Sequence, residues 1–188
     1  MADNKKLHRV FIAIEFPDEV IKEVARMQEI LGNWKFTGKM TELENVHLTL
    51  KFLGEIDSKK VAEVKKKLKE VRFEEFEARL EQVGSFVHGG NPDILWINIG
   101  GKGIFELQKK VDEALESVGF KKEKRFMSHM TIARVKYVKD KKGFLDYVKH
   151  LRLQDIRFKI KEFKLKESEL RALGPIYRDL EVYRLSKK

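Results

Sequence analysis

The chain has 188 residues and carries 40 Lys or Arg against 30 Asp or Glu, a formal net charge of +10. Hydrophobic residues make up 42% and aromatic residues 10%, which is enough to bury a core and excludes a wholly disordered basic tail. The sequence has no cysteine, which excludes disulfides, thiol nucleophiles, iron–sulfur clusters and cysteine-ligated zinc. At roughly 150 residues per domain, we expect one domain over residues 1–188, built from two lobes that share a core.

The positive charge has two interpretations. It favours a polyanionic partner, with nucleic acid as the first candidate. Charged residues at 37%, with frequent Lys and Glu, are also typical of heat-adapted intracellular proteins. The longest apolar run near the N-terminus, Val10–Ile14, is far shorter than the ~18 residues of a membrane span. We therefore expect a cytoplasmic protein with neither a membrane span nor a signal peptide.

Strands and helices are predicted in alternation. Runs of β-branched and aromatic residues predict strands at 7–16, 34–40, 46–53, 76–87, 94–99, 128–137, 156–165 and 177–185. Apolar residues at helical spacing predict helices at 18–32, 58–68, 103–119 and 143–150, the second of them capped by Ser58. Because these elements fall into two similar halves without a linker between them, we expect an α+β fold of two related lobes.

One four-residue pattern occurs twice, as His47-Leu48-Thr49-Leu50 and as His129-Met130-Thr131-Ile132. In a strand the side chains at i and i+2 share a face, so each histidine shares a face with its threonine. By the same alternation Lys51 joins the polar face of the first copy. If a pseudo-twofold axis relates the lobes, the two strands bring both imidazoles and both hydroxyls into one cleft.

Such a cleft suits phosphoryl chemistry without a metal. One neutral imidazole can take a proton from water while a protonated one donates to the departing oxygen, since a histidine pKa of ~6.5 allows both states near neutral pH. Thr49 and Thr131 can hold the non-bridging phosphate oxygens. The remaining histidines, His8, His88 and His150, are expected on the surface.

With these residues in place, the chain resembles the 2H phosphoesterases, and within them the RNA 2′,3′-cyclic phosphodiesterases, also called 2′-5′ RNA ligases. The resemblance covers nearly the whole chain. It rests on the run His47–Gly54, on Arg9–Ile14, on the second motif ending in Ala133-Arg134, and on Ser168, Leu170, Gly174, Pro175 and Tyr177. It implies a bilobal α+β fold in which two antiparallel sheets face a central cleft with helices outside.

The resemblance also implies an activity. The expected enzyme opens 2′,3′-cyclic phosphates at RNA ends, tRNA fragments among them, to 2′-phosphomonoesters, and can run in reverse as a 2′-5′ ligase. We expect His129 to activate water and His47 to protonate the O3′ leaving group, although the symmetry of the site leaves the exchanged roles open. Arg125 resembles the family's phosphate-contacting basic residue, with Lys124 as an alternative. No cofactor is expected, and the protein is expected to be a monomer.

Several alternatives stay open. Family members often have proline before the second histidine, where this chain has Ser128, so the local geometry of that strand is in question. Phe126 is either a core residue or a platform for a base. The run Gly100-Gly101-Lys102-Gly103 fits a helix-entry turn better than a phosphate loop. The competing function from another class is a basic RNA-binding protein whose histidines only contact phosphate.

Overall fold

The computed structural model describes residues 6–172 and 174–187, and the expected domain of residues 1–188 reaches beyond them at both ends. The strands are β1 Leu7–Ile14, β2 Phe36–Met40, β3 Leu48–Asp57, β4 Phe76–His88, β5 Asn91–Gly100, β6 His129–Val138, β7 Arg157–Ile160, β8 Glu162–Arg171 and β9 Gly174–Arg184. The helices are α1 Asp18–Gly32, α2 Ser58–Leu68, α3 Lys102–Glu116 and α4 Lys141–His150, with a single 3-10 turn, η1, at Leu43–Asn45.

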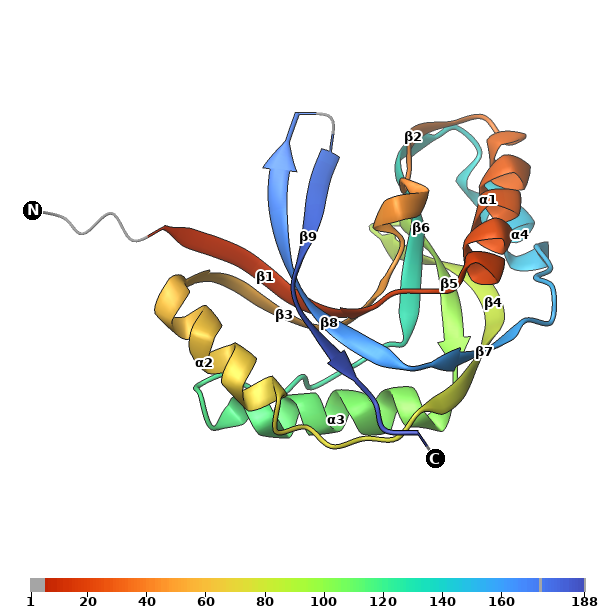
Figure 1. Cartoon of the computed structure of the whole chain (residues 1–188). Coiled ribbons are helices and arrows are strands. Elements are labelled where there is room, and N and C mark those ends of the chain that lie inside the picture. Colours follow the sequence, from red (N-terminus) through yellow and green to blue (C-terminus); the bar gives the residue numbers. More distant parts are fainter. Residues whose placement is uncertain (1–5, 173, 188) are drawn as a thin grey trace, which may run out of the picture.

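The strands of the described residues form one curled antiparallel sheet in the order β7-β4-β5-β6-β3-β1-β8-β9, with β2 paired to β6. Two halves are recognisable, β7-β4-β5-β6 and β3-β1-β8-β9. They are joined through one residue pair, Leu48 opposite Met130. The expected α+β class, with antiparallel strands facing a centre and helices outside, is confirmed, and the two expected sheets are the halves of one sheet (Figure 1).

The helices cover one face of the sheet. Helix α1 packs against β6 and α4 against β4 and β5, whereas α2 and α3 pack on each other and against β3 (Figure 1). Their apolar faces and the inward residues of the strands form one continuous core, in which Ile12, Leu48 and Met130 are fully buried. The strand residues that alternate with these therefore face the other side of the sheet, away from the helices.

The predicted strand at 156–165 is wrong as a single element, because it is two strands broken at Lys161. The buried residues have even numbers before the break, Phe158 and Ile160, and odd numbers after it, Phe163 and Leu165. The alternation of buried and exposed residues therefore shifts by one residue at Lys161. The partners change at the same point, since β7 pairs with β4 whereas β8 pairs with β1 and β9.

Two smaller expectations also need correction. The cap of α2 is Asp57 and not Ser58, because the Asp57 carboxylate accepts a hydrogen bond from the Lys60 backbone N–H at 2.8 Å. His8, expected on the surface, is half-buried between Glu167 at 2.7 Å and the Ser58 hydroxyl at 3.0 Å.

The β4–β5 hairpin and the glycine run before α3 follow from local geometry. Gly89 and Gly90 have φ of +55° and +78°, as a two-residue hairpin turn of this hand requires, so the expected hairpin is confirmed with a tighter turn. Gly103 precedes the first buried turn of α3, and a Cβ there would lie 2.4 Å from the Phe76 ring. Close packing against β4 thus explains this glycine, as a helix-entry turn predicts.

Candidate active site

The two histidine motifs lie side by side at the seam between the halves of the sheet. His129 begins β6, and His47 directly precedes β3. The antiparallel pair Leu48–Met130 sets His47 across from Thr131 and Thr49 across from His129. Opposite residues of such a pair have Cβ atoms only ~4.5–5.5 Å apart. Each imidazole therefore neighbours the threonine of its own motif and that of the other.

Both imidazoles are held in the same way. The Nδ1–H of His47 donates to the Asn45 carbonyl at 2.7 Å, and the Nδ1–H of His129 donates to the Met127 carbonyl at 2.9 Å. A carbonyl only accepts, so the hydrogen of each neutral ring is on Nδ1 and the lone pair is on Nε2. The Thr49 hydroxyl donates to Nε2 of His47 at 3.0 Å. The two motifs thus hold their histidines in the same tautomer, with Nε2 available for proton transfer on both rings.

The environment of His47 favours its neutral form. Burial lowers the pKa of His47, and the positive charges of Lys166 and of protonated His129 act in the same direction. The hydrogen bond to Asn45 and the Glu15 carboxylate oppose them without reversing the direction. His129 thus lies close enough to His47 for its charge to contribute to this shift.

Aromatic rings pack on both histidines. The ring centroids of Phe11 and Tyr177 lie 4.9 and 5.2 Å from that of His47, the Tyr177 ring being perpendicular to the imidazole. Phe86 lies edge-on to His129 at 5.2 Å. Phe11 is buried but is outside the core between sheet and helices, as expected for the opposite face. These contacts explain the burial of His47 without placing it in the core.

A β-bulge follows Thr49 and removes Lys51 from the site. On β1, Ala13 pairs with Thr49 and Ile12 with Lys51, so Leu50 is the extra residue. A bulge resets the alternation, and Lys51 turns toward the helices. Its ammonium is buried and donates to Asp112 at 2.5 Å and to the Lys121 carbonyl at 2.7 Å. The expectation that Lys51 shares the polar face of His47 is corrected, because its ammonium forms an internal ion pair and does not lie on the face where it was expected to bind substrate.

The second motif has the same bulge, which brings Arg134 to the site. On β5, Trp96 pairs with Thr131 and Leu95 with Ala133, so Ile132 is the extra residue. The next residue on the histidine face is then Arg134, five positions after His129, and its counterpart in the first motif is Phe52, which is 67% exposed. The Arg134 charge reaches the site, since it acts on the pKa of Tyr177, which burial raises.

The structure thus provides a basic residue that the sequence reasoning passed over. Arg134 is exposed and has no ion-pair partner among the described residues, so its guanidinium is free to bind an anion. The expected phosphate contact, Arg125, is exposed in the loop between α3 and β6, as is Lys124. The two adjacent apolar residues Ile132 and Ala133, which interrupt the alternation before Arg134, were the signal available in the sequence.

The segment before His129 resolves two open alternatives. Ser128, in place of the expected proline, is buried, and its hydroxyl donates to the Ile99 carbonyl at 2.7 Å. Its carbonyl accepts from the Ile99 N–H at 3.1 Å, so serine extends the β5–β6 ladder into the motif. Phe126 packs against Phe105 of α3 at 5.6 Å and is partly buried on the core, which favours its structural role.

An ionic quartet, which the sequence did not reveal, lies on the same face of the sheet. Lys164 binds Glu15 at 2.6 Å and Asp179 at 2.9 Å, and Lys166 binds the same two carboxylates. Lys166 is paired with Phe11 across the β1–β8 ladder, which places it beside the first histidine. The four residues come from β8, β9 and the end of β1, and their charges balance.

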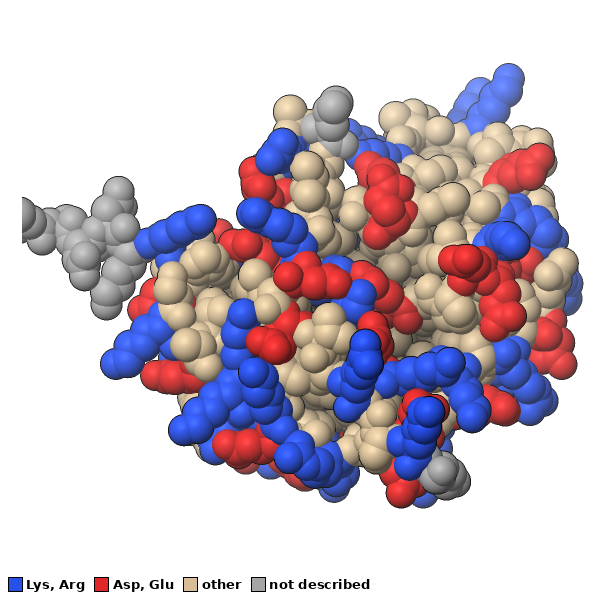
Figure 2. Space-filling view, in the orientation of Figure 1, with Lys and Arg blue, Asp and Glu red and all other residues tan. Residues whose placement is uncertain are grey.

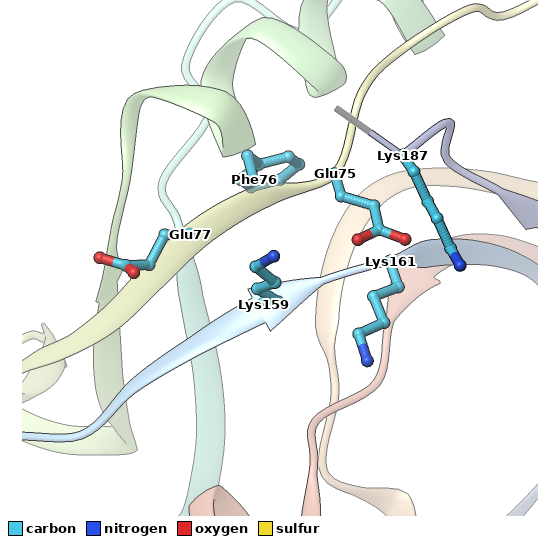
Figure 3. Close-up of a pocket in the computed structure, with 6 residues that line it drawn as sticks. All are labelled: Glu75, Phe76, Glu77, Lys159, Lys161 and Lys187. Atoms are coloured by element: carbon cyan, nitrogen blue, oxygen red, sulfur yellow. The ribbon is translucent and has the colours of Figure 1, made fainter.

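A surface cavity of about 640 Å³ lies away from the histidines. Its lining comes from the start of β4, from β7 and the residue after it, and from the C-terminal segment (Figure 3). The lining residues are Glu75, Phe76, Glu77, Lys159, Lys161 and Lys187. It contains none of the four motif side chains, so the candidate site is the open sheet face at the seam and not this hollow.

Two further features of the described residues concern charge and membranes. Lys and Arg side chains gather over α2 and α3, with Asp and Glu among them (Figure 2). In the part of the chain that the structure describes, no group of three or more His, Asp or Glu side chains has a metal-binding arrangement. Within the same residues, no helix is long and apolar enough to cross a membrane.

Known proteins resemble the chain over most of its length. The family model described as LigT like Phosphoesterase matches residues 14–96 and 100–177. A protein of Methanocaldococcus jannaschii named RNA 2′,3′-cyclic phosphodiesterase is 35% identical over 90% of this chain and 96% of its own. A protein of the same name from Thermotoga maritima is 34% identical over 92% of each. The high proportion of charged residues in this chain, which is typical of heat-adapted proteins, agrees with its thermophilic relatives.

Solved structures agree with the fold. The crystal structure of TT0787 of Thermus thermophilus superposes with a TM-score of 0.81 at 25% identity, covering 96% of this chain and 99% of that one. The Escherichia coli LigT structure in its apo form gives a TM-score of 0.77 at 20% identity, over 96% and 99%. Taken with the paired histidine motifs at the seam of the sheet, these matches show that the chain belongs to the LigT-like family of 2H phosphoesterases.

Proposed function

We propose that the protein hydrolyses 2′,3′-cyclic phosphates at RNA ends to 2′-phosphomonoesters, with His47 and His129 as an acid and base pair. The observation that carries the proposal is the pairing of the two motifs across Leu48 and Met130, in which both rings have Nδ1 bound to a carbonyl and Nε2 available. The names of the relatives from Methanocaldococcus jannaschii and Thermotoga maritima support the same substrate class.

In the proposed reaction Nε2 of His129 takes a proton from water while the water oxygen bonds to phosphorus. The bond from phosphorus to O3′ breaks, and Nε2–H of His47 gives its proton to O3′. His47 is mainly neutral in the free protein, and the negative charge of a bound phosphate raises its pKa toward the protonated form that the acid role needs. Each proton lost by water is thus balanced by one gained by the leaving group.

The other residues of the site would stabilise the phosphate and the nucleoside. The hydroxyls of Thr49 and Thr131 can donate to the non-bridging oxygens, and Arg134 can neutralise the charge that builds up there. We propose Arg134 for this role in place of Arg125, because its side chain lies on the histidine face. Phe52, exposed on the same face, offers a surface on which a base can stack.

The same geometry also supports ligation. A 5′-hydroxyl in place of water would attack the cyclic phosphate and give a 2′-5′ linkage, with the acid and base roles unchanged. We further propose that the chain acts as a single monomeric unit on RNA ends in the cytoplasm, tRNA fragments included, and without a metal. The formal net charge of +10 suits a polyanionic substrate of this kind.

The test is hydrolysis of adenosine 2′,3′-cyclic monophosphate followed by phosphorus NMR. We expect conversion to the 2′-monophosphate alone, with 3′,5′-cyclic AMP unchanged as the control for ring specificity. The His129→Ala variant, prepared in parallel, controls for contaminating nucleases. Recovery of intact substrate from a protein that still binds RNA would refute the proposal and favour the binding protein of the competing interpretation.

A further inference from the structure

The outer half of the β8–β9 hairpin extends past its neighbour in the sheet. Strand β1 pairs with β8 only from Lys164 to Glu167, whereas β8 and β9 stay paired up to Arg171 and Gly174. We call residues 168–172 and 174–178 the hairpin arm. The arm rises from the sheet beside η1 (Figure 1).

The arm has one uncharged face, which is turned to the active site. Ser168 pairs with Tyr177 and Leu170 with Pro175, so these four side chains share a face. Tyr177 lies edge-on to His47, which identifies this face as the one toward the site. The charged residues of the arm alternate with them and pair among themselves, as Arg178 does with Glu169 at 3.7 Å.

The tip of the arm rests on the segment that leads into His47. The Asn45 amide donates from Nδ2 to the Pro175 carbonyl at 3.1 Å. Beside it, a Cβ on Gly174 would lie 2.9 Å from Nζ of Lys39 and 3.1 Å from Oε1 of Glu42, so the backbone of the tip approaches both side chains closely. The φ of Gly174, +138°, is one that other residues rarely adopt.

Asn45 therefore makes two bonds with different purposes. Its side chain holds the tip of the arm, and its backbone carbonyl accepts the Nδ1–H of His47 at 2.7 Å. The second motif has the same carbonyl bond, from His129 to Met127, but Met127 lies in the loop before β6 and belongs to the other half of the sheet. The two histidines thus differ in what fixes their acceptor, although they share its geometry.

We propose that Asn45 is a positioning residue that couples the hairpin arm to His47, so that docking of the arm fixes the ring with Nε2 toward the substrate phosphate. The role of the ring rests on the function proposed above, whereas the coupling rests on the contacts alone. With the arm docked, Tyr177 covers the ring and the carbonyl of residue 45 is held. We call the hydrogen bond from the Asn45 amide to the Pro175 carbonyl the latch. Without the latch, the peptide group of residue 45 can rotate, and the His47 ring can then adopt either tautomer.

The test compares Asn45→Asp with the unmodified protein. Aspartate has the same shape but has no donor for the Pro175 carbonyl, and it places a second carboxylate next to Glu42, whose Oε2 lies 3.5 Å from the amide. Asn91→Asp makes the same chemical change at the exposed first residue of β5 and serves as the matched control. Gly174→Ala displaces the tip from the other side, through strain and through contact with Lys39 and Glu42.

The primary readout is the tautomer of each histidine from nitrogen-15 NMR of the imidazoles. In Asn45→Asp and in Gly174→Ala we expect His47 to show a mixture of Nδ1–H and Nε2–H forms, while His129 keeps Nδ1–H as an internal control. Turnover of the cyclic nucleotide should fall about tenfold with little change in KM, as the loss of one hydrogen bond of ~1.4 kcal/mol implies. Asn91→Asp should change neither.

Two outcomes would decide against the coupling. The first is a folded Asn45→Asp variant in which His47 keeps its tautomer and turnover is unchanged. The second is an equal change at His129, which would indicate general loosening of the protein. If the unmodified protein fails to cleave the cyclic nucleotide, the proposed function fails, but the tautomer measurement still tests the latch.

Discussion

The buried ion pair Lys51–Asp112 allows a sharp test of whether Lys51 is structural or binds substrate. The two side chains are only 2% and 5% exposed. Asp112 also accepts from Gln108 and from the Glu123 backbone N–H, each at 2.8 Å. Asp112→Ala leaves the Lys51 ammonium buried without its counter-charge, and breaking a buried pair in this way costs about 3–5 kcal/mol.

For a chain of this size, each kcal/mol lowers Tm by about 2–4 °C, so Asp112→Ala should unfold about 6–20 °C earlier. In the double variant Lys51→Met with Asp112→Leu no charge is left buried, and the loss of stability should be smaller than the sum of the single losses. Thermal unfolding followed by circular dichroism measures Asp112→Ala and the four proteins of the cycle, which are the unmodified protein, Lys51→Met, Asp112→Leu and the double variant.

Activity on adenosine 2′,3′-cyclic monophosphate completes the test. The double variant should keep most of the kcat/KM of the unmodified protein, measured well below its Tm, because neither side chain faces the histidines. A double variant that folds stably but has lost its activity would refute the reasoning and return Lys51 to the substrate site.

The remaining predictions concern the site itself. His47→Ala and His129→Ala should each lower turnover about 10²- to 10⁴-fold, and the double variant should lose less than the product of the two, as groups acting together do. With His47 as the acid, the residual activity of His129→Ala should fall as pH rises through the lowered pKa of His47, and that of His47→Ala should rise with pH; opposite slopes would exchange the roles. Arg134→Ala should lower kcat/KM about 10- to 100-fold, the worth of a charged hydrogen bond, and Arg125→Ala should have little effect, so equal losses would contradict the assignment. Activity should survive EDTA, and loss that a divalent ion restores would contradict metal-independent chemistry.

The sequence predicted most of the strands and helices because their periodicity is strong. It also predicted that the motifs of His47 and His129 lie close together, because a repeated strand motif implies a shared face. It misplaced Lys51 for a physical reason. The extra residue Leu50 moves every later side chain of the strand to the opposite face. The alternation of polar and apolar residues in the sequence does not show where such a bulge occurs.

Other features depend on contacts between residues far apart in the chain. The latch between Asn45 and Pro175 spans 130 residues, and the pair of Glu15 with Lys164 spans 149. No local pattern specifies such partners. In the sequence, Asn45, Glu15 and Lys164 each have the character of an ordinary surface residue. Arg134 is an intermediate case. Its position, five residues after His129, is visible in the sequence, but the face of the sheet on which its side chain lies depends on the second bulge.

The route of the chain between the halves of the sheet has a consequence for folding. The first and last of the described strands, β1 and β9, belong to one half of the sheet together with β8. Strands β4 to β7 belong to the other half, and β2 and α1 contact β6 across the seam. Neither histidine strand can therefore acquire its neighbours from one contiguous stretch of sequence. Because such non-local pairing slows folding, the pair of histidine strands should form late, in the step that completes the whole molecule. Recovery of activity and recovery of circular dichroism should then follow one time course during refolding, without an inactive species that already has native secondary structure.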